Sequence, residues 1–117
     1  MKKVFKAQLI SLLVMLLIIA ALYIVMLQRP YRLYVGDGCP HCAIVEQYIK
    51  DNNIDAKLTI VQKEVWHNEQ NNAELLQVGA MCGLKGDNLG IPLLYAEGNC
   101  YDGDQPVINF IKSRVGQ

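Results

Sequence analysis

The fold is decided by the stretch LYVGDGCPHC, residues 33–42. Its apolar beginning predicts a short strand over residues 32–35, and the glycine-rich segment 36–38 ends that strand. Pro40 is tolerated in the first turn of a helix, so we expect a helix from Pro40 to about Asn52. Cys39 and Cys42 therefore stand where a strand passes into a helix.

Two cysteines three positions apart at a helix start lie on one face, close enough to form a disulfide. The positive end of a helix stabilises a thiolate, so Cys39, with its sulfur exposed, is the predicted nucleophile. The more shielded Cys42 would then resolve the mixed disulfide. His41, the third candidate catalytic residue, can carry a positive charge or donate a hydrogen bond toward the Cys39 thiolate. A stabilised thiolate makes the disulfide a stronger oxidant, which favours an oxidase or isomerase over a reductase.

The same residues are also compatible with roles outside redox chemistry. His41 could be a solvated surface histidine without a redox role. The C-x-x-C could be half of a zinc site, but such a site needs three or four ligands in short spacings. Cys82 and Cys100 lie far along the chain and form no second C-x-x-C. We therefore expect redox chemistry with no metal and no cofactor, and we keep a metal- or cluster-binding module and a non-catalytic membrane subunit as alternatives.

The N-terminal segment predicts a membrane anchor. Residues 1–6 form a basic flank with three lysines, and no charged residue occurs between Lys6 and Arg29. As a helix, the apolar run Leu9–Leu27 would span about 28 Å, close to the ~30 Å of a bilayer core. A cleavable signal peptide is the alternative, but its apolar core is usually only ~7–15 residues long. We expect a retained transmembrane anchor over residues 7–28, in contact with membrane lipid.

The flanking charges predict the orientation of this anchor. The lysines of the N-terminal flank favour a cytoplasmic N-terminus of a single-pass protein in the cell membrane. Residues 31–117 would then form an extracytoplasmic domain, in a compartment where disulfides form and persist. From Arg29 onward the chain holds eight Lys/Arg against eleven Asp/Glu, a net charge of −3. Because no basic run is interleaved with aromatic residues, we expect no nucleic-acid partner.

Periodicity in the rest of the domain predicts three more strands and two more helices. A second strand is expected within residues 57–65, a third over 92–96 and a fourth from Cys100. One helix should run from Glu69 to Cys82, capped by Asn68, with Leu75, Leu76 and Gly79 facing inward. A last helix should run to Val115 with Asp104 as its cap. The predicted element order is βαβαββα.

These residues resemble the thioredoxin superfamily, and its glutaredoxin-like branch in particular. The likeness covers nearly all of Tyr31 to Val115 and rests on three segments, which are residues 33–42, Gly90-Ile91-Pro92 and Tyr101-Asp102-Gly103-Asp104. It implies an α/β, thioredoxin-like domain after one transmembrane helix. It also implies a cis Ile91–Pro92 bond facing the cysteines, with the Ile91 backbone pairing with a substrate chain. Pro40, Ile91 and Pro92 are thus the candidate substrate-binding residues.

The chain departs from glutaredoxins at two positions. Asp102 replaces a glycine of the glutathione-gripping segment, and Asp37 stands where a basic residue often precedes the first cysteine. Both changes place negative charge where the carboxylates of glutathione would approach, so we expect no glutathione specificity. The Cys-Pro-His-Cys tetrapeptide resembles that of periplasmic disulfide oxidases, although their large helical insertion is absent. We expect cysteine-containing protein substrates and a membrane or soluble redox partner that recycles the centre.

Cys82 and Cys100 have three possible roles, of which a structural disulfide between them is the expected one. A structural disulfide between them would close a loop of about 18 residues and stabilise the fold by about 3 kcal/mol in the chain-entropy model. They could instead be two buried free thiols, or a second redox relay with the first pair. Trp66 is expected to pack against the domain.

Overall fold

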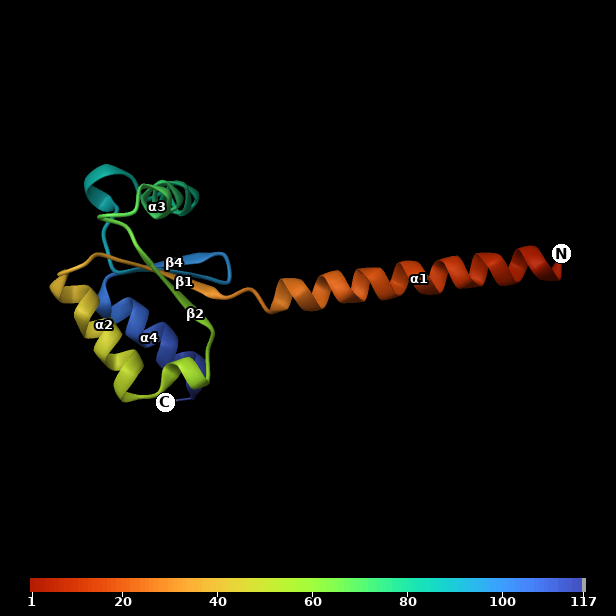
Figure 1. Cartoon of the computed structure of the whole chain (residues 1–117), viewed down its shortest axis with the longest axis horizontal. Helices are drawn as coiled ribbons and strands as arrows, with labels where there is room; N and C mark the ends of the chain where they lie inside the picture. The colour runs from red at the N-terminus through yellow and green to blue at the C-terminus, as the bar shows by residue number, and fades with distance from the viewer. Residues whose placement is uncertain (117) are drawn as a thin grey trace.

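The computed structural model describes residues 1–116 and shows an N-terminal apolar helix followed by a thioredoxin-like α/β domain (Figure 1). This result confirms the predicted fold class and the βαβαββα order of the domain. Two short 3₁₀ helices, η1 (Ile54–Ala56) and η2 (Gly86–Asn88), lie between the main elements. Those elements are α1 (Lys2–Leu27), β1 (Tyr31–Val35), α2 (Pro40–Asp51), β2 (Ile60–Glu64), α3 (Glu69–Met81), β3 (Leu93–Ala96), β4 (Asn99–Asp102) and α4 (Asp104–Val115).

The four strands form one mixed sheet in the order β2-β1-β3-β4. β1 pairs with β2 in parallel and with β3 antiparallel, and β3 pairs with β4 antiparallel. Glu97 and Gly98 form the turn between β3 and β4, and both have positive φ angles, of 53° and 80°. Two such residues fit the right-handed twist of a two-residue hairpin. This sheet order places β1, which leads to the cysteines, in the interior of the sheet.

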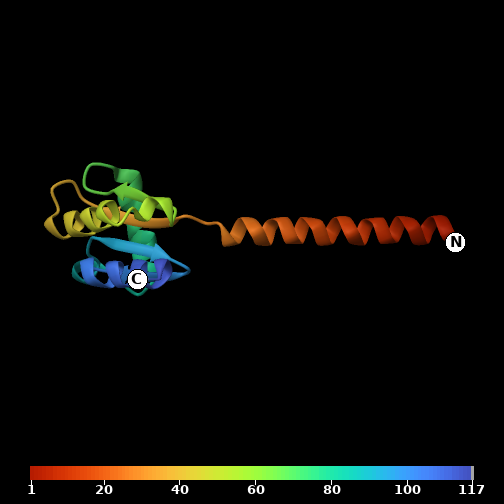
Figure 2. The ribbon, with the colours of Figure 1, turned by 90° about the horizontal axis from the view of Figure 1, so that it is seen from below.

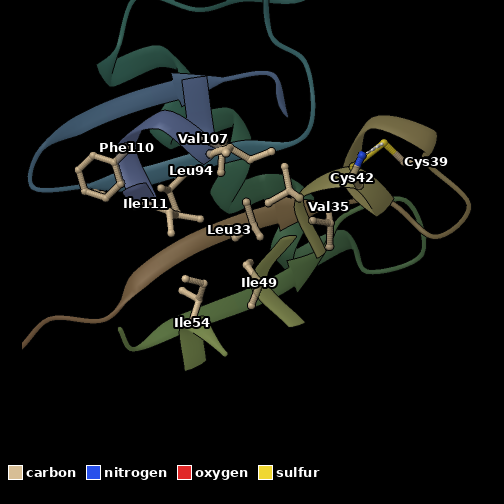
Figure 3. Close-up of a cluster of buried hydrophobic side chains, with 13 residues drawn as sticks. Leu33, Val35, Cys39, Cys42, Ile49, Ile54, Leu94, Val107, Phe110 and Ile111 are labelled. Atoms are coloured by element: carbon tan, nitrogen blue, oxygen red, sulfur yellow. Dashed lines mark hydrogen bonds between the residues drawn. A yellow bond between two sulfur atoms is a disulfide. The ribbon is translucent and has the colours of Figure 1, made fainter. Parts of the chain in front are cut away.

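Helices cover both faces of the sheet. α2 and α4 contact each other on one face and α3 lies on the other, as the two views of the ribbon show (Figures 1 and 2). Side chains alternate along β1 because successive residues of a strand point to opposite faces. Leu33 and Val35 accordingly join the core under α2 and α4 (Figure 3), and Tyr34 joins the smaller core under α3.

Helix α1 is 26 residues long and none of its side chains is buried. It is the one helix within residues 1–116 that is long and apolar enough to cross a membrane, by length and composition. It begins at Lys2 and so includes the basic flank, because lysine is a good helix former. Figure 1 shows α1 projecting away from the domain, to which only residues 28–30 join it.

The structure corrects one predicted side-chain orientation. Leu76 is exposed rather than inward. The helical repeat places Leu75, Val78 and Gly79 on the sheet side of α3 and turns Leu76 away from it. Trp66 packs one side of its ring on the domain, as expected, while 54% of the residue stays exposed.

Two predicted boundaries also change. The cap of α4 is Gly103, with a φ of 94°, and Asp104 is the first residue of the helix. The Asp104 carboxylate accepts a hydrogen bond from the backbone N–H of Gln105 at 2.6 Å. The second strand begins only at Ile60, because the N–H groups of Lys57 and Leu58 are bound to the carbonyl of Ile54, the first residue of η1. Asn68 does cap α3, since its side chain accepts the N–H of Asn71.

Candidate active site

The first cysteine pair lies at the start of α2 and forms a disulfide, with the Cα atoms of Cys39 and Cys42 5.2 Å apart (Figure 3). Cys39 occupies the cap position of the helix with an extended backbone. The backbone N–H of Cys42 donates to the Cys39 sulfur at 3.2 Å. An N–H group at the positive end of a helix thus already points at the sulfur that would become a thiolate, an arrangement that lowers a cysteine pKa.

The sulfurs are less accessible than the sequence suggested. Cys39 is only 7% exposed and Cys42 is fully buried. The expectation of an exposed Cys39 is therefore wrong, because both cysteines pack into the core between the sheet and α2. The expected order of accessibility is confirmed, since Cys39 is more exposed than Cys42. It opens on a groove of about 690 Å³ whose charged lining includes Asp37, Glu46 and Glu64.

The loop before β3 lies against the segment that leads into the cysteine pair. The Ile91–Pro92 peptide bond is cis, as the family resemblance implies. The Pro92 carbonyl accepts the N–H of Gly103 at 2.9 Å, which ties this loop to the start of α4. Ile91 reaches the cysteine loop, since its side chain lies against Gly36, whose carbonyl accepts the N–H of Cys39 at 3.1 Å.

Gly36 is needed where these segments meet. A Cβ atom at this position would lie 2.5 Å from the Trp66 ring and 2.8 Å from the Ile91 side chain. Both distances are shorter than non-bonded carbon atoms tolerate, so only glycine lets the indole rest on the backbone before the cysteines. Trp66 is therefore a residue of the site whose position the sequence did not reveal.

The carboxylate of Glu64, the last residue of β2, binds the backbone both of the loop before Cys39 and of the segment that carries Trp66. It accepts the backbone N–H groups of His67 at 2.8 Å, Trp66 at 2.9 Å and Asp37 at 3.3 Å. Partial desolvation raises the pKa of Glu64, but these N–H donors outweigh it and hold the pKa below its ordinary value. The sequence missed Glu64 because its partners are backbone groups, which leave no signature in residue type.

His41 contacts an acidic side chain from another helix. Its Nδ1 lies 2.9 Å from Oδ2 of Asp104, the first residue of α4. The His41 side chain is 70% exposed and that of Asp104 is 19% exposed. The hydrogen bond from His41 is the main reason that the pKa of Asp104 lies below its ordinary value. The predicted hydrogen bond from His41 toward Cys39 is thus replaced, at Nδ1, by one toward Asp104.

The second cysteine pair also forms a disulfide. Cys82 follows the last residue of α3 and Cys100 lies in β4, with their Cα atoms 6.1 Å apart. Both are bonded, so the alternative of two free thiols does not describe this structure. The loop that this bond closes contains Gly90, Ile91 and Pro92. The disulfide therefore ties down the segment that carries the cis-proline loop.

A charged cluster stands on the α3 side of the sheet, centred on Glu74. Its carboxylate binds Arg32 at 2.5 Å, Lys63 at 2.6 Å and the Tyr34 hydroxyl at 2.9 Å. The hydrogen bond from Lys63, with those from Arg32 and Tyr34, lowers the pKa of Glu74 to about 2 despite desolvation. Burial and the bond to Glu74 raise the pKa of Tyr34. The cluster locks α3 to β1 and β2.

Within residues 1–116, no group of three or more His, Cys, Asp or Glu side chains could hold a metal ion. No family model matches the chain, and no curated protein matches it either. The functional argument therefore rests on the fold and on the cysteine pair at the start of α2.

Proposed function

We propose that this chain is a membrane-tethered thiol–disulfide oxidoreductase that exchanges disulfides with cysteine-containing proteins outside the cytoplasm. The Cys39–Cys42 pair is the reacting centre, and Pro40, Ile91 and Pro92 contact the substrate chain. Oxidation or isomerisation of protein thiols is favoured over reduction, because a helix N-terminus already favours the Cys39 thiolate and a stabilised thiolate makes the disulfide a stronger oxidant, an effect to which His41 can add when it is protonated.

One observation carries this proposal. A disulfide stands at a helix N-terminus, with the Cys42 N–H aimed at the Cys39 sulfur at 3.2 Å. Such a donor stabilises the thiolate that forms when the disulfide opens, and thiolate stability controls the rate and direction of exchange. The difference in burial supports the proposed roles, since Cys39 is the more accessible of the two cysteines and Cys42 is fully buried.

The exchange takes place in two displacements. A substrate thiolate attacks the Cys39 sulfur, a mixed disulfide forms, and the Cys39–Cys42 bond breaks with its electron pair on Cys42, which takes up a proton. A second substrate thiolate then attacks the substrate sulfur of the mixed disulfide and releases Cys39 as a thiolate. The substrate loses two electrons to the cysteine pair, and a redox partner removes them later. In the reverse direction Cys39 attacks and Cys42 resolves.

The position of the cysteine pair in the domain favours protein substrates that reach it from the side away from the membrane, either free of the membrane or protruding from it. β1 begins at Tyr31, directly after the linker, and its five residues span ~17 Å. The cysteines follow its far end, so α2 begins on the side of the domain away from α1 (Figure 1). With α1 in a membrane, the disulfide would face away from the lipid surface.

A redox titration of the full chain in detergent micelles tests the proposal. Samples equilibrated with glutathione buffers are alkylated and weighed by mass spectrometry, which reports the pairing of each cysteine. We expect reversible opening of Cys39–Cys42 at a potential between about −200 and −120 mV. A value near about −270 mV, the thioredoxin range, would make the protein a reductase.

Two variants make the assignment specific. Cys39→Ser should abolish oxidation of a reduced dithiol peptide, whereas Cys82→Ala/Cys100→Ala, which keeps Cys39 and Cys42 and leaves no new free thiol, should still carry out this exchange below its melting temperature. Exchange that survives Cys39→Ser would contradict the proposal, as would purified protein that carries stoichiometric zinc or iron on Cys39 and Cys42. For the location, a membrane-impermeant maleimide should label the reduced cysteines of intact cells, and labelling only after lysis would contradict the orientation.

A further inference from the structure

The pair formed by His41 and Asp104 connects the start of α2, which carries the disulfide, with the start of α4. His41 is the second residue of α2 and Asp104 is the first residue of α4, 63 positions later in the chain. We infer that Asp104 is a positioning residue, which holds the His41 imidazole through Nδ1 and offsets its positive charge. The disulfide would then be a weaker oxidant than the Pro-His dipeptide alone would make it. The inference rests on the proposed function.

The Asp104 carboxylate is held in place independently of His41. Its Oδ1 accepts the backbone N–H of Gln105 at 2.6 Å, which leaves Oδ2 for the imidazole at 2.9 Å. The preceding residue, Gly103, donates its N–H to the Pro92 carbonyl at 2.9 Å. The acceptor for His41 is thus anchored to the same loop that carries the cis proline. The largely exposed imidazole, in contrast, has freedom to move unless this acceptor holds it.

This contact changes what His41 can do for the Cys39 thiolate. A free imidazolium at position 41 could turn toward the sulfur and donate to it, which would stabilise the reduced form and strengthen the oxidant. A carboxylate 2.9 Å from Nδ1 competes for that same donor. It also brings a negative charge next to the positive one, so the thiolate experiences a nearly neutral pair. Both effects favour the disulfide form over the reduced form.

The redox equilibrium of full-length variants in detergent micelles tests this inference. Asp104→Asn keeps a hydrogen-bond acceptor but removes the charge. We expect it to raise the equilibrium constant for reduction by glutathione about fivefold, equivalent to a potential ~20 mV more positive at 29.6 mV per tenfold. Asp102→Asn is the matched control, because it removes a carboxylate two residues earlier on the same segment. It should change the constant by less than about twofold.

A double-mutant cycle shows whether Asp104 acts through His41. In a His41→Ala background, Asp104→Asn should have little effect on the equilibrium constant. An equal shift in both backgrounds would mean that the carboxylate acts directly on the sulfur, and it would overturn the positioning role. The positioning role would also be overturned if Asp104→Asn, with His41 intact, made the disulfide a weaker oxidant or left the equilibrium constant unchanged. These outcomes leave the proposed function intact, whereas a parent protein that exchanges no disulfide overturns both.

A measurement on the parent protein keeps the test independent of variant folding. Nitrogen NMR of the two histidines, with His41 identified by a His67→Gln variant, reports which ring nitrogen carries a proton. We expect protonated Nδ1 at His41 in the disulfide form, since that nitrogen donates to Asp104. An unprotonated Nδ1 with a protonated Nε2 would overturn the proposed contact.

Discussion

Removal of the Cys82–Cys100 disulfide should destabilise the domain by an amount that its loop length predicts. The bond joins residues 18 positions apart. In the chain-entropy model, a loop of this size removes about 10.7 cal/mol/K of entropy from the unfolded chain, or about 3.2 kcal/mol at 25 °C. That is a large fraction of the ~5–15 kcal/mol by which a typical domain is stable. We therefore expect the Cys82→Ala/Cys100→Ala variant to melt ~12–24 °C below the parent.

Guanidinium unfolding of the full chain in detergent micelles measures the effect. Trp66 is the only tryptophan in the chain, so its fluorescence reports on the domain and not on α1. The midpoint should fall by the amount that corresponds to ~3 kcal/mol. The slope of the free energy against denaturant concentration should rise, because an unfolded chain without the cross-link exposes more surface.

The single variants Cys82→Ala and Cys100→Ala, each with the remaining thiol blocked by alkylation, separate the bond from the side chains. Either substitution breaks the same disulfide, so both should lose about as much stability as the double variant. The reasoning would be refuted if the double variant unfolded at the guanidinium concentration of the parent. It would also be refuted if one single variant carried the whole loss while the other matched the parent, because side-chain packing would then account for the effect.

Two further predictions follow from contacts beside the site. Gly36→Ala should displace the Trp66 indole, because the new Cβ would lie 2.5 Å from its ring, and we expect a red-shifted fluorescence maximum and a loss of about 1–3 kcal/mol in stability. An unchanged spectrum would show that the ring does not rest on this backbone. The depressed pKa of Glu74, about 2, means that its ionised form stabilises the fold above its unfolded pKa of ~4.3, and that this stability is lost as the pH falls from about 4.5 through 2. The difference between the stability curves of the parent and of Glu74→Gln should therefore shrink over that interval, and a difference independent of pH would contradict the assignment.

Short-range patterns are the reason that much of the architecture could be read in advance. A strand that breaks at glycines before Pro40 predicts a helix start, and the spacing of Cys39 and Cys42 follows from the helical repeat. The apolar run in α1 depends only on residue type over a continuous stretch. The inward positions of α3 do not follow from such patterns, since Leu75 and Leu76 are equally apolar and only the packed helix shows which of them faces the sheet.

Several features of the site depend on contacts between distant segments. Cys39 belongs to a core cluster to which β1, α2 and α4 all contribute side chains, and no local pattern records that burial. Glu74 gathers its cationic partners from two neighbouring strands, and those strands are brought together by the sheet order.

The sequence by itself determined the class of fold, the position of the C-x-x-C at a helix start and the presence of an apolar segment long enough for a membrane. These properties follow from periodicity, turn residues and spacing, all of which act over a few neighbouring residues. Only the tertiary structure decided that Cys82 pairs with Cys100 and that His41 faces Asp104. Both are contacts between side chains 18 or more positions apart, and their geometry exists only after the sheet and its helices have packed.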